Sequence, residues 1–483
     1  VQQYMMHGGR TNYRNLLRFL RRNIDGKAAF CDAPEAPEEK PTDYLYFPEA
    51  DEERCFTSVA DYERYMKSAG IYVEGGRRII VTGQIADPSD LVKALVATKR
   101  YNVYPVTSLA RLTDYVAEIR PEAVINLAHG RLGDDMVELL KANNTLLFDP
   151  LTINGEAAEW EDDAMGMILS QSVVTPEIDG AIRTQVLFAQ KRDDNGLLKS
   201  YAIPERLESF IATVDRYMAL RTKQNGDKRV AIVYFKGPGQ AKLVASGLDV
   251  VPSLYGFLCN MKAQGYRLDG LPTTLSEFEK QIDERGSIFN SFAAGSAANF
   301  LRNGNPQLVG RDEYDGWCRT SLRADRIDAV NKTFGKFPGD HNILRTDNGQ
   351  LAFPRLQYGN VVILPQPMAG EGKDEFRIVH GTDEVPPHSY IAPYLWIQHG
   401  FRADALIHFG THGSLEFTPQ KQVALSSADW PDRLVGELPH FYLYTIDNVG
   451  EAMTAKRRSY AQMVSHLTPP YHESNLRDTY KGL

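Results

Sequence analysis

Several features that are common in proteins are missing from this chain of 483 residues. The sequence has no run of about 18 apolar residues, so we expect no segment that spans a membrane. Neither G-x-x-x-x-G-K-[ST] nor G-x-G-x-x-G occurs, so we assign no bound nucleotide and expect no ATP hydrolysis by this chain. The few cysteines form no C-x-x-C pair, which argues against a disulfide framework, a structural zinc site or an iron–sulfur cluster. They are Cys31, Cys55, Cys259 and Cys318.

Positive charge is not in excess either. The sequence has 54 Lys and Arg against 62 Asp and Glu, which gives a formal net charge of -8. This balance indicates no basic surface for nucleic acid, and we expect no nucleic-acid partner. With 43% hydrophobic and 24% charged residues the composition is that of a folded globular protein. The length predicts about two to four domains.

Short apolar runs alternate with helical patterns in two regions of the chain. In the first region we expect strands at 79–81, 103–106, 123–127 and 146–148, with helices between them. Strands that alternate with helices of ten or more residues indicate βαβ units and a parallel sheet. A second region of the same type opens with the apolar run 230–235 and returns to strands at 361–364 and 405–407.

The predicted fold class is therefore α/β, with several domains and two or more Rossmann-like units that have mainly parallel sheets. Residues 1–45 are expected to form a helical piece of a preceding domain and a linker, because prolines and acidic residues gather after Gly26. Residues 46–225 are expected to form the first α/β domain. Residues 226–483 are expected to form a second α/β region that continues past the end of the given sequence.

The stretch 404–421, DALIHFGTHGSLEFTPQK, is the strongest candidate for a site. Its apolar run 405–407 predicts a buried strand that brings His408 to its carboxyl end, and Ser414 is placed to cap a short helix carrying Glu416. Ligands of open α/β sheets bind beyond the carboxyl ends of the strands, so His408, His412 and Glu416 are predicted to converge there. Two imidazoles and a carboxylate suit a divalent first-row metal with one position open. Metal affinity should fall as the imidazoles protonate near their usual pKa of about 6.5.

Histidines cluster around this stretch, and the cluster favours a metal site over a chance pattern. Five of the 11 histidines fall within 33 positions: His380, His388, His399, His408 and His412. The competing interpretation is that these side chains pack and hydrogen-bond, as a helical histidine commonly does. Aromatic residues between 305 and 353 leave two similar alternatives, stacking on a flat macrocycle or packing in a core. They include Tyr314, Trp317, Phe334 and Phe337.

A series of short motifs follows one order over about a hundred residues and is far more specific than any single motif. The series is Gln366-Pro367, PPHSY (386–390), HFGTHGSLEF (408–417), WPD (430–432), GELP (436–439), GEAMTAKRR (450–458) and HLTPPY (466–471). It resembles the large subunit of the cobaltochelatase and magnesium-chelatase family, as an internal segment of that subunit. One departure is Thr418-Pro419-Gln420-Lys421, where the family more usually has Leu-Pro-Gly-Lys.

The resemblance implies a subunit that binds a tetrapyrrole while a metal is inserted into it. ATP would be used by separate AAA+ ATPase and adaptor subunits and not bound here. His408, His412 and Glu416 would hold the metal, with Glu416 and His412 in the catalytic role of taking the pyrrole protons. Contacts to the tetrapyrrole would come from His388, Lys421 and the cluster Lys456, Arg457 and Arg458, whose charges suit the carboxylates that fringe such rings. An ordinary basic helix face is the alternative for that cluster.

Several reactions fit the resemblance. Insertion of Co2+ into a corrin precursor is the first expectation, insertion of Mg2+ into protoporphyrin the second, and removal of iron (Fe2+) from haem the third. A different class is a non-catalytic tetrapyrrole- or metal-binding module. The expected location is cytoplasmic, or envelope-associated if iron is removed from haem.

Overall fold

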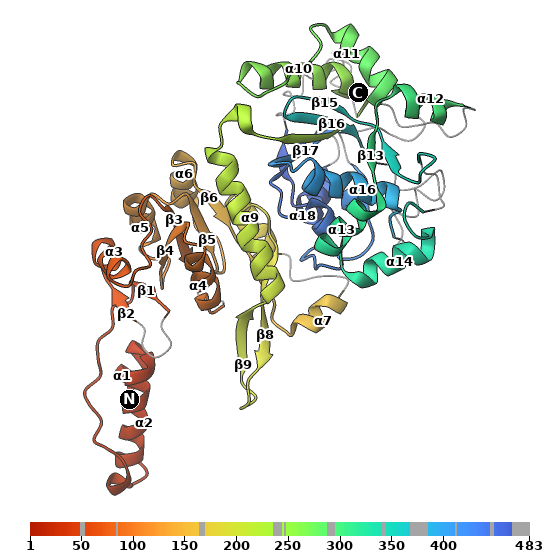
Figure 1. Cartoon of the computed structure of the whole chain (residues 1–483). Helices are drawn as coiled ribbons and strands as arrows, with labels where there is room; N and C mark the ends of the chain where they lie inside the picture. Colours follow the sequence, from red (N-terminus) through yellow and green to blue (C-terminus); the bar gives the residue numbers. More distant parts are fainter. Residues whose placement is uncertain are drawn as a thin grey trace, which may run out of the picture. The chain divides into compact units, whose positions relative to one another are not determined.

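The computed structural model describes residues 1–48, 54–83, 86–163, 170–234, 244–245, 248–286, 295–339, 344–367, 385–410, 413–444 and 449–465. The chain forms two compact units (Figure 1). Unit 1 consists of Val1–Thr152, Leu169–Ala181 and Lys191–Ala202, and unit 2 of Ile153–Ile168, Ile182–Gln190 and Ile203–Leu483. The boundaries expected after residues 45 and 225 stay predictions.

Unit 1 is built on a four-stranded parallel sheet with the order β4-β3-β5-β6. Its strands are β3 (Arg77–Thr82), β4 (Tyr101–Pro105), β5 (Ala123–Asn126) and β6 (Leu146–Phe148). The connecting helices are α4 (Ser89–Ala97), α5 (Leu112–Ile119) and α6 (Asp134–Ala142). The strand–helix alternation predicted between 79 and 148 is thus confirmed, and so is the α/β fold class.

One face of this sheet packs into a continuous core. Ile80 lies in register with Tyr104 and Val124, and Val124 with Leu147. All four are buried in one cluster together with apolar residues of α5, α6 and α3 (Val59–Ser68). The remaining elements of this unit are α1 (Gln2–His7), α2 (Gly9–Asn23), η1 (Ala28–Phe30), β1 (Leu45–Phe47), β2 (Arg54–Phe56), β7 (Leu151–Thr152), η2 (Ser170–Val174), α8 (Thr175–Ile178) and β9 (Leu198–Ala202). β8 (Val186–Arg192) has residues in both units.

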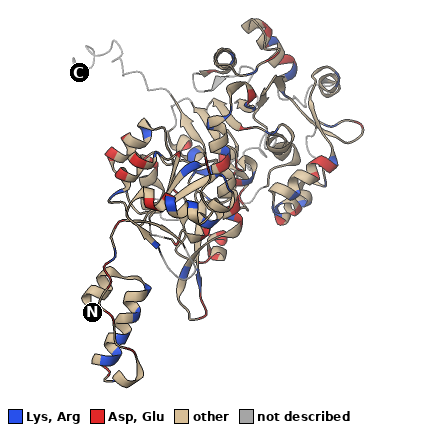
Figure 2. Cartoon of the chain, turned by 60° about the vertical axis from the view of Figure 1, so that its left-hand side comes forward, with Lys and Arg blue, Asp and Glu red and all other residues tan. Residues whose placement is uncertain are grey.

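Charge of both signs is interspersed over most of the described helices (Figure 2). Helix α2 differs, because its sequence GRTNYRNLLRFLRRN has five arginines and no acidic residue. The pair Arg18 and Asp32 ties this helix to the segment that follows it, with 2.9 Å between Nη2 and Oδ2. None of the helices in the described part of the chain is both long and apolar enough to cross a membrane.

Unit 2 is built on a six-stranded sheet with the order β15-β16-β10-β17-β18-β19. Only β15 runs antiparallel to its neighbour. The strands are β10 (Val230–Tyr234), β15 (Leu356–Tyr358), β16 (Val361–Pro365), β17 (Ala405–Gly410), β18 (His440–Tyr444) and β19 (Gln462–Val464). Because β16 and β17 flank β10 on opposite sides, the strand order reverses at β10, and the carboxyl ends of β10 and β17 border the usual ligand crevice of such sheets.

Helices and short segments of unit 2 surround this sheet. They are α7 (Ala157–Asp162), α9 (Pro204–Thr222), η3 (Asn225–Asp227), β11 (Val244–Ala245), β12 (Leu248–Asp249), α10 (Val250–Ala263), α11 (Leu275–Gln281), η4 (Ile282–Gly286), α12 (Ser296–Asn303), β13 (Gln307–Val309), α13 (Arg311–Ser321), α14 (Ala324–Phe334), β14 (Leu351–Phe353), α16 (His388–Leu395), η5 (Trp396–Gly400), η6 (Leu415–Phe417), α17 (Trp430–Val435) and α18 (Val449–Arg458).

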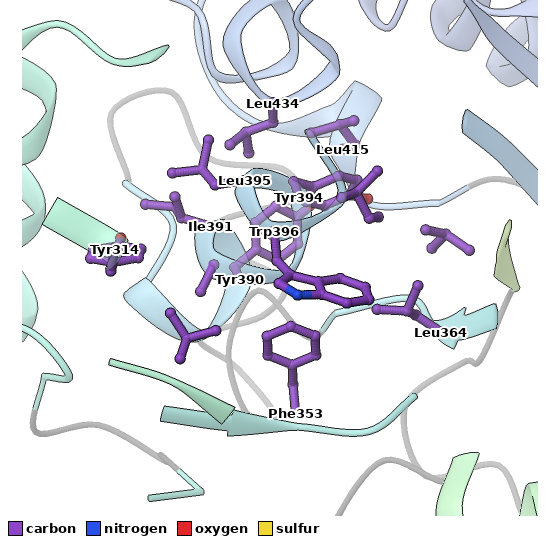
Figure 3. Close-up of a cluster of buried hydrophobic side chains, with 14 of the residues drawn as sticks. Tyr314, Phe353, Leu364, Tyr390, Ile391, Tyr394, Leu395, Trp396, Leu415 and Leu434 are labelled. Carbon is purple, nitrogen blue, oxygen red and sulfur yellow. The ribbon is translucent and has the colours of Figure 1, made fainter. Parts of the chain in front are cut away.

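The largest core of unit 2 gathers around α16. This helix buries Tyr390, Ile391, Tyr394 and Leu395, and Figure 3 shows side chains of several other elements arranged around it. Such a helix, apolar nearly all round, is stable only in an interior. The aromatic residues between 305 and 353 belong to this core: Tyr314 stacks on Phe337 at 4.6 Å between ring centroids, and Trp317 and Phe334 pack against the cluster. Core packing is therefore the confirmed interpretation for these four side chains.

A buried carboxyl group in unit 1 gives the fold a pH dependence. Asp149 follows β6, and its Oδ2 accepts a 2.7 Å hydrogen bond from Nδ2 of Asn126 at the end of β5. Burial raises the pKa of Asp149 from 3.8 to about 7, against the lowering effect of the Asn126 bond and with a further increase from Asp179. The folded chain therefore keeps a proton that the unfolded chain releases between these two pKa values.

We predict that this proton makes the wild-type chain lose stability as the pH rises. Because the folded state binds more protons, the free energy of unfolding should fall between pH 5 and pH 8 by about 2–3 kcal/mol from this group alone. Asp149→Asn keeps an acceptor for Asn126 but cannot ionise. Urea unfolding of both proteins at pH 5 and pH 8 isolates the effect, and an equal pH dependence in the two proteins would show that Asp149 titrates normally.

Candidate functional site

The site lies where β17 ends beside β10 in unit 2. His408 pairs with Val233 of β10 and with Tyr442 of β18, and the strand continues to Gly410. The backbone N–H of Gln366, just past β16, donates to the carbonyl of Tyr234 at 2.9 Å. The parallel register therefore brings the residues that follow three neighbouring strands to one edge of the sheet.

A continuous chain of hydrogen bonds passes through His408. Nε2 of Gln366 donates to the Tyr394 hydroxyl at 2.9 Å, and that hydroxyl lies 3.1 Å from Nε2 of His408. Nδ1 of His408 lies 2.6 Å from Nε2 of His440, whose Nδ1 lies 2.6 Å from the carbonyl oxygen of Ser459. Both imidazoles are buried, so these hydrogen bonds replace the bonds to water that the two side chains would otherwise make.

Glu416 lies on η6 and is buried as well. Its Oε1 accepts a 2.8 Å hydrogen bond from the backbone N–H of Gly413. Burial raises the pKa of Tyr390, Tyr394 and Tyr442, and the negative charge of Glu416 raises the pKa of each further. Three phenols thus stay protonated around one carboxylate.

Ser414 does not cap the short helix as predicted. It precedes η6, but no hydrogen bond from its side chain caps that segment. Its hydroxyl instead lies 2.9 Å from the Tyr390 hydroxyl and accepts from Nε2 of Gln366 at 3.2 Å. The buried tyrosine and amide take the hydroxyl because they would otherwise lose partners in the interior.

Gly413 leaves a small space between the polar groups of the site. A Cβ atom at this position would lie 2.9 Å from Oε1 of Gln366, 3.3 Å from Oε2 of Glu416 and 3.4 Å from the Tyr442 hydroxyl. The same glycine thus links Glu416 to Gln366, which leads on to Tyr394 and His408. His408 and Glu416 therefore belong to one polar cluster.

The three-residue metal site stays a prediction. His412 lies outside the described residues, and no group of three His, Cys, Asp or Glu side chains that could hold a metal occurs within the described part of the chain. The expected pKa near 6.5 is wrong for His408. Burial lowers the pKa of His408 well below that value, with a further lowering from His440, whose own pKa burial lowers to about 4.

His388, a predicted tetrapyrrole contact, is held in the core. Its Nδ1 lies 2.9 Å from the Tyr314 hydroxyl and its Nε2 lies 3.0 Å from the carbonyl oxygen of Gly335. A carbonyl accepts only, so Nε2 carries the proton and Nδ1 accepts from the phenol. Burial lowers the pKa of His388, which agrees with this neutral form.

Arg458 is buried and binds the backbone of the segment that follows Glu416. Its guanidinium donates to the carbonyl oxygens of Glu416 at 2.5 Å, Lys421 at 2.7 Å and Pro419 at 3.4 Å. Burial lowers the pKa of Arg458 to about 10. These bonds give Arg458 a structural role that the sequence did not indicate, while its role as a tetrapyrrole contact stays a prediction.

Lys421 is buried in the same segment. Its ammonium group donates to the carbonyl oxygens of Trp160 and Asp163 at the end of α7, and its backbone N–H donates to Oδ1 of Asp429 at 2.9 Å. Burial lowers the pKa of Lys421. Lys456 and Arg457 are half-buried on α18, and their predicted tetrapyrrole contacts stay predictions.

Sequence reasoning missed His440 and Tyr394. His440 directly follows the motif GELP, and Tyr394 follows PPHSY by four residues. The available signal was this proximity to motifs, because residues that adjoin a site often support it. Sequence spacing alone does not indicate that His440, 32 residues after His408, contacts His408 from the neighbouring strand.

We predict that Gly413→Ala destabilises the chain by about 1–3 kcal/mol, because the added methyl group overpacks a space bounded by three oxygen atoms. Gly256→Ala is the matched control. Gly256 is exposed in α10 with open space at its Cβ position, so alanine should stabilise the helix by about 0.5–1 kcal/mol. Urea unfolding measures both, and equal stabilisation by the two variants would show that the site is looser than described.

Comparison with known proteins finds a family model and several relatives that match this chain. A family model described as CobN/Magnesium Chelatase matches residues 2–483. Magnesium-chelatase subunit ChlH, chloroplastic, of Oryza sativa subsp. indica is 35% identical over 331 residues, which cover 67% of this chain and 22% of that protein. Aerobic cobaltochelatase subunit CobN of Pseudomonas aeruginosa is 32% identical over 326 residues, which cover 64% of this chain and 25% of that protein.

Two further matches extend over nearly the whole chain. An uncharacterized protein of Methanocaldococcus jannaschii is 29% identical over 518 residues, covering 99% of this chain and 40% of that protein. The structure of the catalytic subunit of cobaltochelatase from Mycobacterium tuberculosis has a TM-score of 0.74 and 28% identity, covering 97% of this chain and 39% of that one. The chain thus spans less than half the length of each of these four relatives. The resemblance found in the sequence is confirmed, and the chain belongs to the CobN/magnesium chelatase family.

Proposed function

We propose that this chain is part of the large, tetrapyrrole-binding subunit of a metal chelatase, and that metal and macrocycle meet at the carboxyl edge of β10 and β17. The observation that carries the proposal is the buried polar cluster of His408, Glu416, Gln366 and the three tyrosines at this edge. A crevice at the point where strand order reverses is where open α/β sheets bind ligands.

Metal insertion needs a temporary ligand for the cation and a base for the pyrrole protons. Glu416 supplies a carboxylate in a dry environment, where its attraction for a cation is stronger than in water. His408 supplies an imidazole, and His412 is the second imidazole of the predicted set. In this proposal the cation is the substrate, and Glu416 and His412 take the protons that the macrocycle releases.

Donor chemistry favours cobalt. Imidazole nitrogen binds Co2+ well, whereas Mg2+ prefers oxygen ligands and keeps several waters. We therefore propose insertion of Co2+ into a corrin precursor. Magnesium is the second candidate, because Gln366, Glu416 and Tyr442 direct three oxygens toward the space at Gly413.

Energy for insertion would come from partner subunits. The sequence lacks the phosphate-binding loop that ATP hydrolysis requires, so ATPase subunits are the proposed source. Lys456 and Arg457 are proposed to bind the carboxylates of the macrocycle through charge-assisted hydrogen bonds.

The test uses the complete subunit with its ATPase partners and follows metallation of the tetrapyrrole by absorbance. We predict that His408→Ala and Glu416→Gln each lower the rate by about 100-fold or more, because each removes a group that binds the cation or takes a proton. Tetrapyrrole affinity should change little. His399→Ala is the matched control, because this half-buried histidine bonds to Ser321 at 2.6 Å, apart from the polar cluster.

Two outcomes would contradict the proposal. Rates close to wild type in both variants would remove the cluster from the reaction. Tetrapyrrole binding without any turnover by the wild-type complex would favour a non-catalytic binding module.

A further inference from the structure

The hydrogen-bond chain through His408 has a fixed direction. The carbonyl oxygen of Ser459 can only accept, so Nδ1 of His440 must carry a proton. In neutral His440 the other nitrogen, Nε2, is then an acceptor. Nδ1 of His408, 2.6 Å away, must therefore be the donor.

This direction determines which nitrogen of His408 is available to a metal. With its proton on Nδ1, neutral His408 has its lone pair on Nε2, the atom that faces the Tyr394 hydroxyl at 3.1 Å. Tyr394 therefore donates to His408 and accepts from Gln366. The lone pair is directed toward the same cluster that contains Glu416.

We propose that His440 is a positioning residue, which fixes the tautomer of His408 so that Nε2 faces the cation, and that the Tyr394 hydroxyl occupies this nitrogen until the cation displaces it. The inference rests on the proposed function and names the support of its metal ligand. Ligating histidines commonly donate their second N–H to a partner that sets ring orientation and basicity.

A neutral hydrogen-bond partner for His408, here His440, suits a site that must release its metal. A carboxylate in the place of His440 would draw the proton from Nδ1 more strongly and make Nε2 a stronger ligand. The series of hydrogen bonds ends at the backbone carbonyl of Ser459, which neither donates nor accepts a proton in a transfer. These hydrogen bonds therefore fix the tautomer of His408, and they do not form a pathway for proton transfer out of the site.

The test combines a spectroscopic measurement with metal binding. Long-range proton–nitrogen correlation spectra of the 15N-histidine-labelled chain report which ring nitrogen of His408 is protonated, without metal or tetrapyrrole. Titration with Co2+ then gives the affinity. We predict protonated Nδ1 in the wild type.

Variants at position 440 separate positioning from a merely structural role. His440→Leu removes the acceptor, so His408 should populate both tautomers and Co2+ affinity should fall by about 10- to 100-fold. His440→Gln offers an amide oxygen near the position of Nε2, so tautomer and affinity should stay close to wild type. Tyr394→Phe should keep the tautomer and raise Co2+ affinity, because no hydroxyl then has to be displaced.

Two results would overturn the assignment of His440 as a positioning residue. A proton on Nε2 of His408 in the wild type would overturn the inference, and so would unchanged tautomer and affinity in His440→Leu. Should the tautomers respond as predicted while the wild-type complex inserts no metal, the proposed function fails and the assignment of His440 survives.

Discussion

A buried loop must find partners for its backbone carbonyls, and the segment after β17 meets this requirement through Arg458. One guanidinium binds three carbonyl oxygens between Glu416 and Lys421. Irregular backbone cannot supply such partners itself, and unpaired buried carbonyls cost about 1–3 kcal/mol each. The position of Glu416 at the sheet edge therefore depends on a residue 42 positions later in the chain.

Sequence patterns were sufficient for the fold class, and they also led to the prediction that His408 and Glu416 lie close together. The spacing of apolar residues predicted the βαβ units. Because ligands of open α/β sheets bind beyond the carboxyl ends of the strands, His408 and Glu416 were predicted to lie at one edge of the sheet. Arg458 was assigned to a tetrapyrrole-binding cluster because its positive charge suits the carboxylates of such a ring, and the alternative was an ordinary basic helix face. Its burial follows from how α18 packs against η6, and His440 meets His408 only through pairing of β17 with β18. Such contacts depend on tertiary structure, which no local pattern encodes.

The ionisable side chains of the site are buried, and most of them are uncharged. Burial lowers the pKa of both histidines and raises the pKa of three tyrosines, so these side chains stay neutral, while the guanidinium of buried Arg458 donates to the backbone carbonyl of Glu416. In the proposed function, burial strengthens the attraction of the Glu416 carboxylate for a cation, and the nearby positive charge of Arg458 weakens it. A moderate hold on the metal is what transfer to a macrocycle requires, because a ligand set that binds too tightly would keep it.

The central claim, that the edge of β10 and β17 receives the metal, is tested most directly by anomalous diffraction from crystals of the chain soaked with Co2+. We expect a cobalt peak at roughly 2.0–2.2 Å from Nε2 of His408 and from a carboxylate oxygen of Glu416, with the Tyr394 hydroxyl displaced from that nitrogen. Cobalt bound elsewhere, with the contact between Tyr394 and His408 intact, would contradict it.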